Sequence, residues 1–155
     1  MNQAAFTEAL GEIWENTPAI AQQSWQNRLF TDITALHQSM VKVVQQMSPA
    51  EQLALIQAHP DLGSKTKMAQ ASVQEQSQVG LNTLSSAEYQ QFQSLNQAYQ
   101  DKFGFPFIIA VKNHTKTSIL AAFKRRLQNS LDAEKQQALT EISQIARFRL
   151  EAIVS

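Results

Sequence analysis

Apolar residues recur at helical spacing along most of the chain. Tyr89, Phe92 and Tyr99 fall on one face of a continuous stretch, with Leu95 or Asn96 between them, and this 3.6-residue period is typical of an amphipathic helix. The same period predicts further helices, over residues 6–14, 18–25, 33–47, 50–57, 119–127 and 138–153.

Three short motifs mark predicted helix starts. Ser48, Ser72 and Ser85 are each followed three positions later by a glutamate, which is the capping-box pattern in which serine and glutamate side chains satisfy the first free backbone N–H groups. Pro49 strengthens the first start because proline suits the first helical position. The second box predicts a short helix that opens after Ser72 and is closed by Gly80.

The segment after the Tyr89–Tyr99 helix is the most apolar part of the chain and the least helical. Gly104 and Pro106 interrupt any helix there, and the β-branched residues that follow favour an extended backbone. No second extended stretch is available to pair with it. The pattern therefore predicts an all-α fold, a single-domain helical bundle over residues 1–155 with one extended segment, Phe107–Val111, buried inside it.

Such a segment needs hydrogen-bond partners for its backbone, because buried N–H and C=O groups are rarely left unpaired. Two partners fit the sequence. A small, amide-rich ligand could bind along the segment, or side chains from helix ends could satisfy it while it packs as core.

A rigid corner follows the predicted helix over residues 50–57. Pro60 disfavours helical backbone at His59 and cannot donate a hydrogen bond, and Gly63 allows a backbone conformation that other residues avoid. The corner, residues 58–63 (Ala-His-Pro-Asp-Leu-Gly), therefore holds an imidazole at a helix end. Either the helix dipole simply favours a histidine there, or the imidazole is a functional group.

Composition removes several classes of protein. The 155 residues suit one domain, and 13 basic residues balance 13 acidic ones, so bulk charge does not favour nucleic acid or an anionic membrane surface. The absence of cysteine excludes disulfides and thiolate chemistry and agrees with a reducing cytoplasm. No signal peptide and no membrane-spanning segment are expected.

The remaining candidates suit acid–base or electrostatic chemistry. None of the three histidines, His37, His59 and His114, has a second ligand at metal-binding spacing, so we expect no metal site. His37 lies in step with a helical apolar face and is interpreted as structural, and His114 lies in a polar turn that we expect to be exposed to solvent.

Two charged residues have a structural and a functional interpretation each. Glu75 fits the capping role at its helix start, but it also places a carboxylate beside Gln76 in a helix first turn. Arg149 lies beside the apolar stripe of the last helix, nearer to it than Arg147. It either extends its charged end to solvent or binds a carboxylate with its planar fork.

Read together, three segments resemble the 2-oxo-4-hydroxy-4-carboxy-5-ureidoimidazoline (OHCU) decarboxylase family of urate catabolism. They are the corner at residues 58–63, the Ser-x-x-Glu-Gln run at residues 72–76, and the apolar run at residues 103–112. The resemblance covers nearly the whole chain, and the three motifs occur in order at matching spacing.

The resemblance implies an all-helical enzyme without metal or organic cofactor that converts OHCU to (S)-allantoin. By motif match it implies catalytic roles for His59 as proton donor, Glu75 and Arg149. The segments that match the family's substrate-binding positions are Pro60, Ser72, Val73, Gln74, Gln76, Phe107, Ile108, Ile109, Ala110 and Val111.

The expected partner is a small molecule, with no nucleic acid and no membrane, and a homodimer is an open alternative. Residues 153–155 lack a peroxisomal signal, so a cytoplasmic enzyme is expected. The competing interpretation is a non-catalytic helical module that binds a purine-like ligand or a peptide near residues 103–111.

Overall fold

The computed structural model describes residues 33–63 and 70–154 and the single positions Ala4, Ile13 and Ile20. Its helices are α3 (Ile33–Gln46), α4 (Pro49–Gln57), α5 (Gln70–Gln78), α6 (Ser86–Phe103), α7 (Lys116–Arg126) and α8 (Leu131–Val154). No strand occurs in this part of the chain, and the predicted all-α fold is confirmed. The helices expected over residues 6–14 and 18–25 fall outside the described residues, apart from Ile13 and Ile20.

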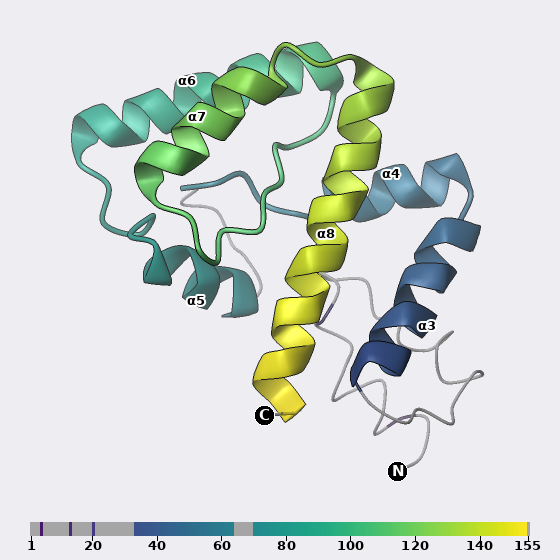
Figure 1. Cartoon of the computed structure of the whole chain (residues 1–155). Coiled ribbons are helices and arrows are strands. Elements are labelled where there is room, and N and C mark those ends of the chain that lie inside the picture. Colours follow the sequence, from purple (N-terminus) through teal and green to yellow (C-terminus); the bar gives the residue numbers. More distant parts are fainter. Residues whose placement is uncertain (1–3, 5–12, 14–19, 21–32, 64–69, 155) are drawn as a thin grey trace.

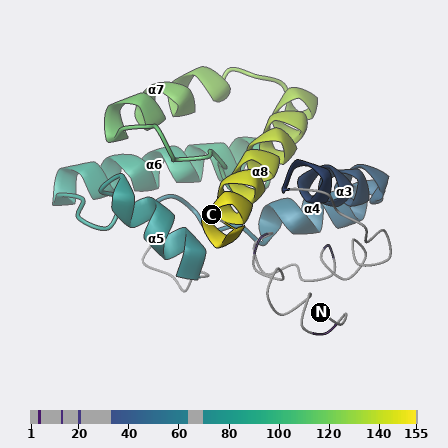
Figure 2. The same cartoon turned by 60° about the horizontal axis from the view of Figure 1, so that its bottom comes forward.

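Helix α8 is the long central element of the molecule. Figures 1 and 2 show α3 and α4 on one side of it and α5, α6 and α7 on the other, and both α3 and α4 pack directly against it. Its buried face includes Ala138, Ile142, Ala146 and Leu150. No helix in the described ranges is long and apolar enough to cross a lipid bilayer.

The predicted starts of α4 and α6 are confirmed by their side-chain hydrogen bonds. Ser48 and Ser85 each accept a bond from the backbone N–H three residues on, and the glutamate there accepts one from the serine N–H. A third box, formed by Thr115 and Ser118, opens α7. At the other end of α6, Gly104 adopts φ +80° and closes the helix in the left-handed conformation.

The apolar run after α6 is buried, as the sequence predicts. Every residue from 105 to 111 is buried, and the run passes through the interior without helix or strand between α6 and α7 (Figure 1). Tyr99, itself fully buried, is the hub of an aromatic cluster with Phe103, Phe105, Phe107 and Phe123. The segment is therefore an integral part of the core.

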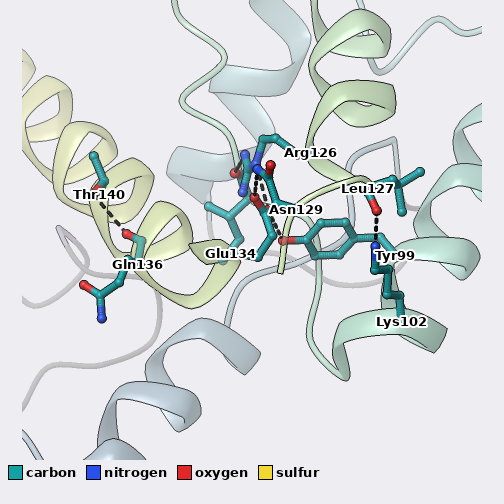
Figure 3. A network of polar contacts seen from close by, with 9 residues as sticks. Tyr99, Lys102, Arg126, Leu127, Asn129, Glu134, Gln136 and Thr140 are labelled. Carbon is teal, nitrogen blue, oxygen red and sulfur yellow. Dashed lines mark hydrogen bonds and ion pairs between the residues drawn. The ribbon is translucent and has the colours of Figure 1, made fainter. Parts of the chain in front are cut away.

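Helix-end side chains contribute the polar contacts around this segment. The Nη1 of Arg126, the last residue of α7, donates a hydrogen bond to the Ile108 carbonyl oxygen at 2.6 Å. Arg126 also forms a buried ion pair with Glu134 at 2.9 Å, and the Tyr99 hydroxyl donates to the same carboxylate (Figure 3). Of the two partners considered for the segment, the structure contains the helix-end side chain.

Candidate active site

The corner at residues 58–63 ends α4 as the sequence predicts. The helix stops at Gln57 and Ala58 forms its C-cap, after which Pro60 is half-buried and Gly63 has φ +68°. The His59 side chain is buried, with 8% of the residue exposed. His59 is therefore not a surface histidine that only interacts with the helix dipole.

One ring nitrogen of His59 has a defined role. Nδ1 lies 2.9 Å from the Leu55 carbonyl oxygen, one turn earlier in the chain. A carbonyl oxygen can only accept, so Nδ1 carries a proton and donates a hydrogen bond to the Leu55 carbonyl oxygen. The tautomer is thereby set, and Nε2 is the nitrogen through which the imidazole can exchange a proton.

Polar side chains from two other helices hold the far end of the corner. Asn96 of α6 donates from Nδ2 to the Leu62 carbonyl oxygen at 2.9 Å, and the Gly63 N–H donates to Oε1 of Gln76 in α5 at 3.1 Å. Both Asn96 and Gln76 are buried. Helices α4, α5 and α6 therefore all fix the backbone that carries His59.

A cavity of about 270 Å³ opens beside the corner, lined by Gln57, His59, Pro60, Asp61, Gln100, Gly104, Phe105 and Pro106. Burial raises the pKa of the Asp61 carboxyl, and the Gln100 side chain, which hydrogen-bonds to it, offsets part of that rise. The cavity is thus bordered by the imidazole-bearing corner, by α6 and by the start of the buried apolar run.

Glu75 and Arg149 form the second polar centre. Arg149 donates from Nε to Oε2 of Glu75 at 2.9 Å and from Nη2 to Oε1 at 3.0 Å, a two-point ion pair between α8 and α5. Its Nη1 also donates to the Ile13 carbonyl oxygen at 3.3 Å. The Arg149 side chain is 5% exposed and that of Glu75 is 28% exposed, so the arginine does not extend its charge to solvent.

The capping role predicted for Ser72 and Glu75 is wrong. Helix α5 begins at Gln70, so Ser72 lies inside the helix and Glu75 is no longer in its first turn. Residues 72–75 match the capping-box pattern, but the Glu75 carboxylate forms an ion pair with the guanidinium of Arg149, which is a stronger partner than a backbone N–H. The Ser72 side chain lies outside the described part of the structure.

The other predicted substrate-binding residues are not all placed alike. Val73 is 44% exposed and Gln74 is exposed on α5, whereas Gln76 turns inward to the corner. The 107–111 segment is buried throughout. The structure therefore brings the corner, α5 and α8 together through Gln76 and the Glu75–Arg149 pair, and leaves Val73 and Gln74 at the surface.

The remaining histidines make local contacts. His37 lies 2.8 Å through Nε2 from the Ser143 carbonyl oxygen, joining α3 to α8, which agrees with its structural interpretation. His114 is half-buried, contrary to its expected exposure, because Nδ1 contacts the Ser118 hydroxyl at 2.9 Å at the start of α7. Within the described ranges, no three histidine, aspartate or glutamate side chains cluster closely enough to hold a metal ion.

Three buried polar residues near these centres were missed by sequence reasoning. Asn96, Arg126 and Glu134 are 3%, 4% and 0% exposed. A signal for each was present, because each lies in step with an apolar stripe: Asn96 between Phe92 and Tyr99, Arg126 after Ile119 and Phe123, and Glu134 before Ala138 and Ile142. A polar residue at a core position of a helix needs a buried partner.

These features define an all-α protein that holds a buried imidazole and a carboxylate–guanidinium pair whose arginine is buried. The family model for OHCU decarboxylase matches residues 1–151 of the chain. A 2-oxo-4-hydroxy-4-carboxy-5-ureidoimidazoline decarboxylase of Halalkalicoccus jeotgali is 43% identical over 156 residues, covering 99% of this chain and 89% of that protein.

Two longer proteins contain a similar region. The uric acid degradation bifunctional protein of Bacillus subtilis is 44% identical over 155 residues, which are 100% of this chain and 31% of that protein. A solved structure described as (S)-allantoin synthase superposes with a TM-score of 0.81 at 32% identity, covering 99% of this chain and 51% of that one. The chain belongs to the OHCU decarboxylase family.

The geometry of the corner predicts unequal effects of two glycine substitutions. At Gly63 an added Cβ would lie 2.9 Å from Leu84 Cδ1, whereas at Gly104 it would meet no atom within 4 Å, and both residues have positive φ. We expect Gly104→Ala to lower the free energy of unfolding by about 1–2 kcal/mol, the cost of a left-handed alanine, and Gly63→Ala to lower it further. Urea unfolding measures both; equal losses would contradict the close packing at Gly63.

The raised pKa of Asp61 predicts a pH-dependent stability difference. Because the native state holds this proton more tightly than the unfolded chain does, the wild-type protein loses stability relative to Asp61→Asn as pH rises from about 4, near the unfolded pKa. We therefore expect the variant to gain more stability over wild type at pH 7 than at pH 4. Urea unfolding at both pH values tests this, and an unchanged difference would argue against the shift.

Proposed function

We propose that this protein catalyses the decarboxylation of OHCU to (S)-allantoin without a cofactor. The observation that carries the proposal is the buried His59 imidazole, whose Nδ1–H group is bonded to the Leu55 carbonyl oxygen, and the proposal assigns proton transfer to its other ring nitrogen, Nε2. Family membership indicates the reaction, and this geometry fixes the ring: with the Nδ1–H group bonded to the Leu55 carbonyl oxygen, the ring donates a proton from Nε2 when it is in the imidazolium form.

The substrate explains why side chains can suffice. In OHCU the carboxylate is attached to a carbon next to a ring imine. When the bond to the carboxylate breaks and carbon dioxide leaves, the electron pair moves into the ring toward that imine. A proton is then taken up, and its delivery to one face of the ring sets the (S) configuration. An imidazole side chain is a common general acid for such a transfer.

The Glu75–Arg149 pair fits a second role in the proposal. The two-point contact fixes the carboxylate plane of Glu75 on α5, next to Gln76, which holds the corner that carries His59. A carboxylate with fixed orientation can align the substrate's polar groups before the bond breaks, which lowers the cost of reorganisation in the transition state.

The proposal includes the setting of the enzyme. We assign residues 1–155 to one domain that acts in the cytoplasm on a small molecule, with neither nucleic acid nor membrane as a partner. The balanced charge of 13 basic and 13 acidic residues does not favour binding to nucleic acid or to an anionic membrane surface.

Replacement of His59 tests the proton-transfer role. We expect His59→Ala to lower the rate of (S)-allantoin formation by about 10²–10⁴-fold, the usual contribution of a general acid, while the helical circular dichroism stays unchanged. OHCU would be generated from urate by urate oxidase and hydroxyisourate hydrolase, and the optical activity of the allantoin followed. His37→Ala is the control, because His37 lies on α3 and its ring is bonded to the Ser143 carbonyl oxygen of α8.

Two outcomes of the same assay would overturn the proposal. Racemic allantoin formed at the same rate with and without the wild-type protein would show that it is not a decarboxylase. Binding of (S)-allantoin without turnover would favour the non-catalytic module instead.

The ion pair predicts a second loss of activity. We expect Glu75→Gln to reduce turnover by about 10²-fold or more, because the isosteric amide removes the charge that Arg149 orients. Glu88→Gln on α6 removes an exposed carboxylate that pairs with Lys116 at 3.4 Å and is expected to retain wild-type turnover. Steady-state rates of both variants decide the point; similar rates would remove Glu75 from the mechanism.

A further inference from the structure

Arg126 joins two parts of the core that are distant in the chain. Its Nε lies 2.9 Å from Oε1 of Glu134, with side-chain exposures of 5% and 0%. Asn129 donates to Oε2 of the same carboxylate at 2.8 Å, and Tyr99 donates to Oε1. Figure 3 shows these side chains converging on Glu134 of α8 from α6, α7 and the α7–α8 connection. The guanidinium is therefore held in one orientation.

The same guanidinium contacts the apolar segment in two ways. Nη1 donates to the Ile108 carbonyl oxygen at 2.6 Å, and the group lies over the Phe107 ring at 4.4 Å from its centroid. The opposite face of that ring stacks on Phe123, with centroids 3.7 Å apart. Arg126 thus fixes both the side chain of Phe107 and the backbone of Ile108.

These contacts lie on one edge of the segment. In an extended chain, the backbone groups of residues two apart point to the same edge and those of the residues between point to the other. Ile108 faces Arg126, and the Ala110 N–H faces the Glu141 carboxylate closely enough to lower its pKa, against a larger rise caused by burial. Side chains of α7 and α8 therefore occupy the place of a partner strand.

The other edge carries the backbone groups of Phe107 and Ile109. Both residues are buried, at 0% and 5% exposure, and no hydrogen bond from the described residues reaches their backbone. Buried backbone groups are seldom left unpaired. This edge is therefore suited to a ligand that carries amide and carbonyl groups, as the ureido and ring groups of OHCU do.

Stability alone does not account for the arrangement. A buried ion pair is often no more stabilising than apolar side chains of the same shape, and Nη2 of Arg126 is buried without a hydrogen-bond partner in the described residues. What the guanidinium does supply is direction, because its planar fork holds Glu134 and Ile108 at a fixed angle.

We propose that Arg126 is a positioning residue for substrate binding: from behind the 107–111 segment it sets the register of the edge that the substrate contacts. This inference rests on the proposed function, since it assumes that OHCU binds along Phe107 and Ile109. Arg126 itself does not touch the substrate.

A pair of variants separates positioning from general support of the fold. Glu134→Gln alone keeps Arg126 and its bond to Ile108. Arg126→Met combined with Glu134→Gln removes that bond and leaves no unpaired buried charge. We expect the double variant to bind (S)-allantoin about tenfold or more weakly, as loss of a bond to a charged group implies, and to raise KM similarly with a smaller change in kcat. The single variant keeps the bond from Arg126 to Ile108, so its affinity should fall less than that of the double variant.

The controls keep each outcome informative. Equal affinity in both variants and wild type, or equal loss in both variants, would overturn the positioning role. If the double variant is too unstable in urea unfolding for its affinity to be measured, Arg126→Lys replaces it. Lysine keeps the positive charge but lacks the planar fork of arginine, so we expect KM to rise. A KM equal to that of the wild type would overturn the proposal. Absence of turnover by the wild-type protein would instead refute the proposed function.

Discussion

An extended segment buried without a partner strand is the constraint on which this structure depends. Its backbone groups cannot reach water, so something else must pair with them. Side chains at helix ends provide the pairing: Arg126 donates a hydrogen bond to the Ile108 carbonyl oxygen. The charge of Arg126 is in turn balanced by Glu134, which also accepts a hydrogen bond from Asn129. The polar network inside an otherwise apolar bundle is needed because one stretch of non-helical chain is buried there.

The same logic organises the corner that carries His59. Helix α4 ends before Pro60, and the backbone at Leu62 and the left-handed Gly63 is paired with Asn96 and Gln76 from two other helices. Irregular backbone is thus found where helical side chains meet, and those are also the places where the proposed chemistry lies. Regular helices supply the frame, while the two irregular segments supply oriented groups that a helix interior cannot present.

Much of this was predictable from the sequence, and the failures share a cause. The helix starts at Ser48 and Ser85, the stop at His59–Pro60 and the buried Phe107–Val111 run depend on local rules, and the structure confirms them. Ser72 and Glu75 match the same capping-box pattern, yet the Glu75 carboxylate binds Arg149, which lies 74 positions away in the chain. Local patterns cannot rank a backbone cap against a distant guanidinium. Arg126 follows the apolar positions Ile119 and Phe123, but only its contact with Glu134 reveals it as part of the core.

Helix α8 links the two ion pairs mechanically. Glu134 stands in its first turn and Arg149 near its other end, and at 1.5 Å per residue the fifteen positions between them span about 22 Å. A stiff rod that is clamped at both ends transmits any sliding or tilting to both clamps together. Partial opening of α8 would release the Glu75 carboxylate and the Ile108 carbonyl in the same event. The contacts of both ion pairs should therefore be lost together rather than one at a time, and states in which only one of them is broken should be rare in the native ensemble.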